Sequence, residues 1–444
     1  MRVVDPEGQW VAVEGEPRLM RKKDFLKGEK GVFRLYQEGL DNDRDGMINE
    51  DGRGGVDLGI NFPHLFPDRL PHAGDWPGSE SETFELIRFA TAHREIAMTL
   101  VLGETNFCYK PPRSDRKSRT DFSKIKVPEE IGRRLGLDSS RTYTLQEIVT
   151  ATRETDQPEM KLRGAMVVPL LGLGPVVNPL PEDLVFYEEI TRKYRKFLRE
   201  KGIPVERHDP RKALDGSFEL WSYYQLGLPS FSLDCWWIPK KEKKKTDVTE
   251  TPKTDDGKET CGPDPVEESL LHFCDANPEE QGFVPWTKSS HPLFGEVEIG
   301  GFVPYFDQNP PRKDIDGAVE SQLSWIVELA AKRASLAIHS SRVVEEGAGL
   351  FRISTWIENR GLLPYPTAMG ACNGRTKPIF VVLDGEGIEY LSGRKRERIY
   401  SVGGHSTRKI EWLIRSKKPQ RLRISMSSDY AGGAVSFVRV GGAS

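Results

Sequence analysis

Cysteine and long apolar runs are both scarce in this sequence, and each shortage excludes a class of protein. The five cysteines lie far apart and form none of the close pairs that metal or redox motifs require: Cys108, Cys235, Cys261, Cys274 and Cys372. An odd number leaves a free thiol, which favours a reducing compartment, although Cys261 and Cys274 could pair in an exported protein. No run of about 18 apolar residues and no apolar signal-peptide core is visible. The sequence as given therefore predicts a cytoplasmic protein without a membrane span.

An excess of positive charge is also lacking. The net charge is -3 and the pI is about 6.3, whereas phosphate binding requires a basic surface, so we expect no nucleic-acid partner. A length of 444 residues is too great for one ordinary domain. The chain is therefore expected to form at least two globular parts.

Helical and strand patterns alternate over residues 1–310 and predict an α/β domain. Ser79 is expected to cap a helix that ends near His93, because Glu82 stands three residues later, as in a capping box. The apolar run at residues 96–102 has the length and the β-branched content of a buried strand. A second short strand is expected at residues 229–233.

The remaining chain divides into three stretches. Residues from about 240 to 264 carry almost no apolar side chains and predict a flexible insertion within the first domain. A connecting helix is expected within residues 311–340, at about 314–338. Residues 341–444 then show short alternating runs separated by Gly, Asn and Pro turns, which is typical of an all-β sandwich.

An aspartate-rich loop is the strongest candidate metal site in the sequence. Its carboxylates stand at every second position and are followed by a glycine, a spacing that surrounds a calcium ion with oxygen ligands. The candidate calcium ligands are Asp41, Asp43, Asp45, Met47 (through its carbonyl) and Asn49. The twelfth position of an EF-hand loop would be Gly52, where a bidentate Glu is required, so the match is incomplete. We expect a structural role for calcium here, with a metal-free acidic turn as the alternative.

Five segments, in order along the chain, resemble segments of the zinc carboxypeptidases, and in particular of the large bacterial members of that family. They are residues 55–63 (GVDLGINFP), 79–83 (SESET), the strand at 96–102, 216–234 (GSFELWSYYQLGLPSFSLD) and 291–301 (HPLFGEVEIGG). Together they cover most of residues 18–310. The resemblance implies a mixed sheet flanked by helices.

The zinc of this family is held by two His and one Glu, of which one His and the Glu form a His-x-x-Glu motif near the front of the fold. None of the eight histidines here is followed by Glu at that spacing. The family's front segment is thus absent, and the resemblance implies a partial, N-terminally truncated fold. If the true start lies upstream, we expect an exported protein.

The other functional positions of the family are also changed. Gly103 stands where the last zinc-binding His is expected, and Gly59 and Ile60 replace the Asn-Arg pair that clamps the substrate carboxylate. Asp234 stands at the position of the general base, normally Glu, and is one methylene shorter. The resemblance therefore implies a degenerate member in which zinc and peptidase activity are not expected. Its former cleft is left to bind an unknown peptide or protein ligand without using a free carboxylate.

Two alternatives remain open. A metal-dependent carboxypeptidase or other hydrolase could use ligands outside the family set, and its candidates are Glu104, Asp234, His64, His72 and His208. The chain could instead be a calcium-stabilised structural or adhesion module, for which Trp236, Trp237 and Trp286 would have to form an exposed patch. Packing inside the protein is the competing expectation for these tryptophans.

Overall fold

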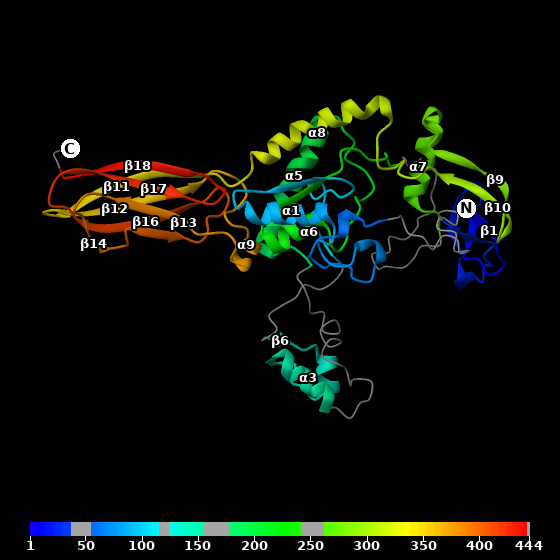
Figure 1. The fold of residues 1–444 in the computed structure, drawn as a ribbon, viewed down its shortest axis with the longest axis horizontal. Coiled ribbons are helices and arrows are strands. Elements are labelled where there is room, and N and C mark those ends of the chain that lie inside the picture. The colour runs from blue at the N-terminus through cyan, green and yellow to red at the C-terminus, as the bar shows by residue number, and fades with distance from the viewer. Residues whose placement is uncertain (37–54, 115–123, 155–176, 241–261, 442–444) are drawn as a thin grey trace.

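A computed structural model describes residues 1–36, 55–114, 124–154, 177–240 and 262–441. In these residues, helices and strands of the N-terminal two thirds are followed by a sandwich of antiparallel strands (Figure 1). The expected order of an α/β part and a strand-rich C-terminal part is confirmed at this level. The arrangement of strands in the first part differs from the expectation.

The N-terminal strands pair with a hairpin formed almost 300 residues later. They build one antiparallel sheet in the order β3-β2-β4-β1-β10-β9. The strands are β1 (Arg2–Val4), β2 (Trp10–Val13), β3 (Glu16–Lys22), β4 (Phe33–Leu35), β9 (Phe283–His291) and β10 (Gly295–Phe302). Helix α7 (Pro265–Ala276) packs against β9 and β10 through Leu270, Cys274 and Phe273. This sheet was not predicted, because three of its strands are only three or four residues long.

A parallel pair of strands forms the centre of the α/β part. β5 (Thr99–Leu102) runs beside β8 (Ser230–Leu233), with Leu102 opposite Leu233. All four residues of β8 are buried, as expected for a strand covered on both faces. The helices around this pair are α1 (Ser81–Ala92), α5 (Pro181–Glu200), α6 (Phe218–Trp221) and α8 (Ile315–Ala330). A family-like large mixed sheet is not seen in the described residues, which hold only these two parallel strands.

Two helix predictions require correction. Ser79 does not cap α1: its Oγ accepts a hydrogen bond from Asn61 Nδ2 (3.1 Å) and donates to Glu80 Oε1 (2.8 Å). Residue Glu80 occupies the cap position and makes no side-chain cap bond. The connecting helix α8 ends at Ala330, eight residues before the predicted end, because Leu336 already belongs to a strand.

No helix in the described parts is long and apolar enough to cross a membrane.

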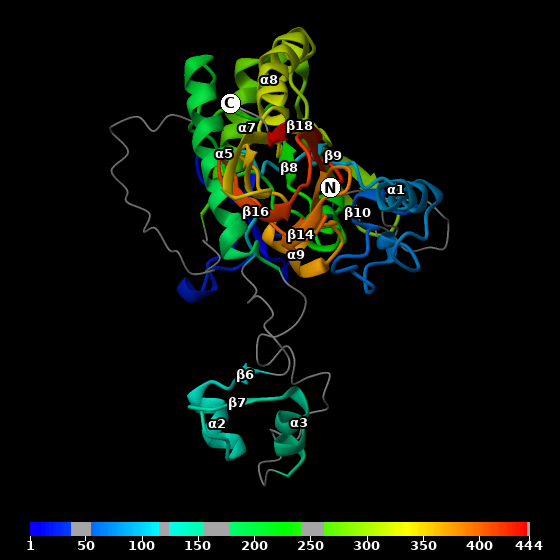
Figure 2. The same ribbon diagram turned by 90° about the vertical axis from the view of Figure 1, so that its left-hand side faces the viewer.

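Short elements complete this part of the chain. A small lobe holds β6 (Ile125–Lys126), α2 (Glu129–Leu135), β7 (Thr142–Tyr143) and α3 (Leu145–Glu154), and it lies apart from the other elements in both views (Figures 1 and 2). It has its own apolar cluster around Ile125 and Ile148. The remaining single turns are η1 (Phe25–Lys27), η2 (Leu58–Ile60), η3 (Pro71–Ala73), η5 (Ser222–Leu226), η6 (Pro278–Glu280) and η7 (Arg312–Asp314).

The C-terminal strands form two four-stranded antiparallel sheets. One has the order β11-β12-β16-β14 and the other β15-β13-β17-β18. The strands are β11 (Leu336–Gly347), β12 (Leu350–Asn359), β13 (Ile379–Asp384), β14 (Glu389–Ser392), β15 (Arg396–Ile399), β16 (Thr407–Arg415), β17 (Gln420–Ser427) and β18 (Gly433–Val440). Alternate residues such as Leu422, Ile424 and Trp412 point inward and join one apolar cluster. This packing of two sheets is the predicted sandwich.

One short helix of the C-terminal part packs into the α/β part. Helix α9 (Ala368–Asn373) places Met369 in the same apolar cluster as Tyr223 and Phe231. A Cβ added to Gly227 would lie 2.3 Å from the Cα of Gly370, so only glycine permits this approach. Helix α9 therefore contributes to the core of the α/β part, whereas the sandwich strands form a cluster of their own.

Candidate functional site

Asp234 and Gly103 lie side by side at the carboxyl ends of the parallel strands. The N–H of Gly103 donates to the carbonyl of Leu233 (3.1 Å), which continues the ladder between β5 and β8 by one residue. In open α/β sheets, ligands bind at this edge. A Cβ built on Gly103 would meet nothing within 4 Å, so the position faces open space but offers no ligand atom.

The carboxylate of Asp234 is held by a buried arginine. Arg207 donates from Nη1 to Oδ1 (2.8 Å) and from Nη2 to Oδ2 (2.5 Å), and Asn106 Nδ2 donates to Oδ1 (2.5 Å). Only 5% of the Arg207 side chain and 9% of the Asp234 side chain are exposed. Burial raises the pKa of Asp234 above its ordinary value, and the hydrogen bonds from Arg207 oppose that rise. Both oxygens of Asp234 are thus occupied by donors of the protein itself.

Arg207 is in turn fixed on every side. Its guanidinium lies over the Trp237 ring, 4.2 Å from the centroid, and 5.3 Å from the centroid of Tyr109. Its Nε donates to the carbonyl of His208 (3.1 Å). A planar guanidinium that stacks on aromatic rings and binds a carboxylate through two bonds has little freedom to leave.

The segment at Gly59 and Ile60 offers no carboxylate clamp. The N–H of Gly59 donates to the Asp57 side chain (2.8 Å), and Ile60 is buried with 3% exposure. The backbone carbonyl oxygen of Ile60 lies so close to Gly216 that a Cβ built on Gly216 would be only 2.1 Å from it. Neither Gly59 nor Ile60 presents a side-chain donor, as the sequence predicts.

Glu219 is a buried carboxyl that the sequence analysis did not select. It lies on α6 with 7% exposure and accepts a hydrogen bond from Thr105 Oγ1 (3.1 Å), two residues after Gly103. Burial raises the pKa of Glu219, and hydrogen bonds, among them the one from Thr105, only partly offset the rise. Its place in the segment GSFELW, where the carboxypeptidases have Asp, was the signal that could have identified it.

The alternative metal ligands do not converge in the residues described. Glu104 pairs with Arg211 (2.7 Å), and His64 is stacked on Tyr224 with 4.2 Å between ring centroids. His208 Nε2 contacts Ser269 Oγ (2.8 Å). His72 is exposed, and its carbonyl accepts from Asp57 N–H (2.7 Å). Over the described ranges, no group of three or more His, Cys, Asp or Glu side chains could hold a metal ion.

The predicted calcium loop cannot be placed in the same way. Its candidate ligands lie outside the described residues: Asp41, Asp43, Asp45, Met47 and Asn49. Calcium binding therefore stays a prediction from the spacing of the carboxylates.

The three tryptophans proposed as a surface patch are half-buried. Trp236 packs edge-on against Phe273 with 5.6 Å between ring centroids, and Trp237 covers Arg207. Trp286 Nε1 donates to the carbonyl of Arg18 (3.0 Å). Each ring is engaged inside the protein, which agrees with the packing expectation.

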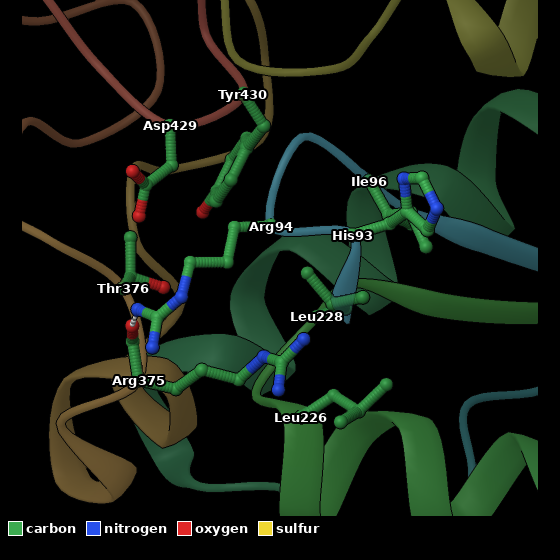
Figure 3. Close-up of a pocket in the computed structure, with 9 residues that line it drawn as sticks. All are labelled: His93, Arg94, Ile96, Leu226, Leu228, Arg375, Thr376, Asp429 and Tyr430. Carbon is green, nitrogen blue, oxygen red and sulfur yellow. Dashed lines mark hydrogen bonds between the residues drawn. The ribbon is translucent and has the colours of Figure 1, made fainter. Parts of the chain in front are cut away.

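A small cavity lies where α1 and the turn after it meet the sandwich (Figure 3). Its volume is about 10 Å³, which is room for about one water molecule. Arg94 donates to the carbonyl of Arg375 (2.8 Å), and Arg375 donates to the carbonyl of Ala90 (2.6 Å) at the end of α1. A cavity of this size cannot hold a substrate, so these arginines join the two parts of the chain.

In the comparison with known protein families, the match covers only the C-terminal sandwich. Residues 335–438 match the model of a domain of unknown function (DUF8731). No curated protein matches the chain. Similar solved structures include the GAE domain of GGA2p from Saccharomyces cerevisiae, with 10% identity and a TM-score of 0.15, over 24% of this chain and 95% of that domain.

Two β-glucosidases show a comparable local likeness. DesR from Streptomyces venezuelae has 10% identity and a TM-score of 0.15, over 24% of this chain and 15% of its own. The GH3 enzyme from Bifidobacterium adolescentis has 14% identity and a TM-score of 0.14, over 24% and 17%. At these scores the likeness carries no argument about function, and none of these comparisons bears on the carboxypeptidase resemblance.

Proposed function

We propose that the chain is a zinc-carboxypeptidase-like protein without peptidase activity, whose former active-site edge is closed by its own Arg207. The observation that carries the proposal is the buried contact in which Arg207 binds both oxygens of Asp234. A general base must accept a proton from water within about 3 Å. Arg207 and Asn106 already fill three of the roughly four acceptor sites of the Asp234 carboxylate, and the guanidinium neutralises its charge, which makes Asp234 a poor base for water.

The residues at this edge do not fit a zinc ion. A catalytic zinc needs three protein ligands and one open position for water. Gly103 has no side chain, and Asp234 is already neutralised by a guanidinium. The proposed function therefore does not involve zinc at this edge.

A binding role is the activity that remains for this part of the protein. Gly59 and Ile60 offer no cationic side chain for a terminal carboxylate, so recognition of a peptide or protein ligand would depend on other groups. We expect a peptide acid and its amide to bind with affinities that differ by less than about tenfold. If titration calorimetry showed that the peptide with a free carboxylate binds much more tightly than its amide, a carboxylate clamp would have to exist.

The direct test is a hydrolysis assay on peptides with free carboxyl ends, with and without added zinc. We expect no turnover by the wild-type chain, by Asp234→Asn or by Arg207→Ala, because removal of Arg207 frees one carboxylate, whereas a catalytic zinc needs three protein ligands. Zinc-dependent turnover that Asp234→Asn abolishes, in a variant that still unfolds cooperatively, would overturn the proposal.

The calcium-stabilised module is a second role that is compatible with the first. The carboxylate spacing at Asp41, Asp43 and Asp45 supports it. Its expected effect is a higher unfolding temperature in calcium than in chelator, and an unchanged temperature would reject it.

A further inference from the structure

We propose that the open edge of strand β16, at residues 408–411, is a docking site for an extended acidic peptide segment, which adds to the sandwich as a further strand. The site belongs to the C-terminal sandwich and is independent of the Asp234 edge. Three features of the sandwich support the proposal: an unpaired strand edge, a groove beside it, and the charges that line the groove.

The edge is open because β14 covers only the end of β16. On one side β12 pairs with β16 from Thr407 to Arg415. On the other side β14 pairs only with residues 413–415. In the described chain, no other backbone hydrogen bond reaches residues 408–411. Backbone groups at such an edge are a template for strand addition.

A shallow groove runs along this edge. It has a volume of about 580 Å³ and lies between β16 and β15, the terminal strand of the other sheet. Strand β14 ends at Ser392, and at the next residue, Gly393, a Cβ would lie 2.9 Å from the carbonyl of Glu411 in β16. An added strand opposite four residues would span roughly 13 Å. The groove is therefore placed to receive a short extended segment.

The groove is lined by three basic side chains and two acidic ones: Arg398, Arg408, Lys409, Glu397 and Glu411. Glu397 accepts a hydrogen bond from the backbone N–H of Arg394 (2.6 Å). Arg398 and Arg408 are exposed and form no ion pair with a carboxylate of the described residues. Lys409 pairs with Glu411 (2.7 Å), and Glu411 also accepts from Ser354 Oγ (2.8 Å). Two guanidinium groups thus remain for carboxylates of a ligand, which they can bind through two bonds each.

Side-chain alternation adds an apolar requirement. Ile410 is half-buried and follows Arg408 by two residues, so both side chains lie on the same face of β16. Buried Ile399 of β15 also lines the groove. The segment that fits carries an acidic residue opposite Arg408 and an apolar one opposite Ile410.

The same charges disfavour a second copy of this chain at the edge. In the antiparallel register that pairs Arg408 of each copy with Lys409 of the other, like charges lie opposite each other, which destabilises a strand pair. Basic side chains on an edge prevent self-association in this way. An acidic strand turns the same charges into attraction.

The probe is the peptide fluoresceinyl-Gly-Thr-Glu-Thr-Val-Thr-Glu-Thr-amide, in which Val and the two Glu share one face of a strand, so that a Glu can lie opposite Arg408 while Val lies opposite Ile410. It is titrated with the full chain and followed by anisotropy. We expect saturable binding that is lost when Lys replaces each Glu. Methylation of alternate backbone nitrogens, which removes strand hydrogen bonds but keeps the charge, should weaken binding by roughly tenfold or more. The variant Arg408→Glu should weaken it by a similar factor.

The matched control is Arg439→Glu, which makes the same charge change on β18, away from the groove. It should leave the affinity unchanged, and all variants should keep the wild-type unfolding temperature. Equal binding of the methylated peptide, or an equal loss in Arg439→Glu, would overturn the proposal. Binding of an acidic polysaccharide such as polygalacturonate, without binding of the peptide, would assign the groove to a glycan and also overturn it.

Discussion

At the scale of single residues, Arg207 holds together segments of the α/β part that are far apart in the sequence. It lies on the segment before α6, binds Asp234 at the end of β8, and stacks on Trp237 beyond it. The resemblance to carboxypeptidase segments singles out Asp234 in the sequence, but nothing there indicates a partner 27 residues away. Pairing across a fold depends on tertiary approach, which local patterns do not encode.

Removal of Arg207 should be costly. We expect Arg207→Ala to lower the free energy of unfolding by about 3–5 kcal/mol, because it leaves the carboxylate of Asp234 buried without a cation. The comparison is Arg211→Ala, which breaks exposed pairs with Glu104 and Asp307 and should cost less than about 1 kcal/mol. Denaturant titration of both variants measures the difference. Equal losses would mean that the Asp234 contact is as weak as a surface pair.

The buried carboxyl of Glu219 should make stability depend on pH. Its pKa is raised in the folded protein above the ordinary value of 4.5, so the folded state binds more protons between those two values. Stability from this group is therefore lost as pH rises through the folded pKa. We expect Glu219→Gln to be more stable than wild type at neutral pH, with a gap that narrows toward pH 4.5. A less stable Gln variant at neutral pH would show that the carboxylate is satisfied when charged.

At the scale of elements, local patterns predicted some parts well and failed on others. The helix α1, the existence of strand β5 and the alternating strands of the sandwich follow from hydrophobic periodicity, which acts within a few residues. The prediction that β5 is buried is wrong, because Thr99–Val101 are half-buried and Leu102 is 60% exposed. The N-terminal sheet does not, because β1 becomes a central strand only by pairing with β10. Tertiary pairing rather than propensity makes these short segments strands.

The close packing of α9 against η5 can be tested with two glycines. Gly227 and Gly374 both have left-handed backbones, with φ of 68° and 64°. An added Cβ meets the backbone of Gly370 at Gly227 but nothing within 4 Å at Gly374. We expect Gly374→Ala to cost about 1–2 kcal/mol for its backbone alone, and Gly227→Ala to cost clearly more. Similar unfolding midpoints for the two variants would contradict the contact.

At the scale of the whole molecule, one carboxylate connects the α/β part to the sandwich part. Asp183 of α5 is 1% exposed and accepts the N–H groups of Ala368 (2.8 Å) and Met369 (3.0 Å), and the hydroxyl of Tyr223 (2.8 Å). It thus caps α9 from a distance of 185 residues in sequence. Hydrophobic periodicity predicts the two parts but not this junction, since neither Asp183 nor Ala368 belongs to a recognisable sequence motif.

Replacement of Asp183 should loosen the junction. Asp183→Asn places an amide N–H₂ against backbone donors, so we expect a loss of about 1–3 kcal/mol in the free energy of unfolding. The neighbouring exposed Glu182→Gln should change it by less than about 0.5 kcal/mol. Thermal unfolding followed by circular dichroism measures both. An Asp183→Asn variant as stable as Glu182→Gln would mean that the two parts are held together elsewhere.

The proposed function depends on the absence of a zinc site at the edge formed by Gly103 and Asp234. The most direct measurement is the metal content of the purified, dialysed protein by plasma mass spectrometry, scored for zinc and calcium together. The account predicts negligible zinc, with calcium near about one equivalent if the aspartate-rich loop binds it. Stoichiometric zinc, lost on replacement of Asp234 or Glu219, would contradict it and show that this edge of the parallel strands still holds a metal.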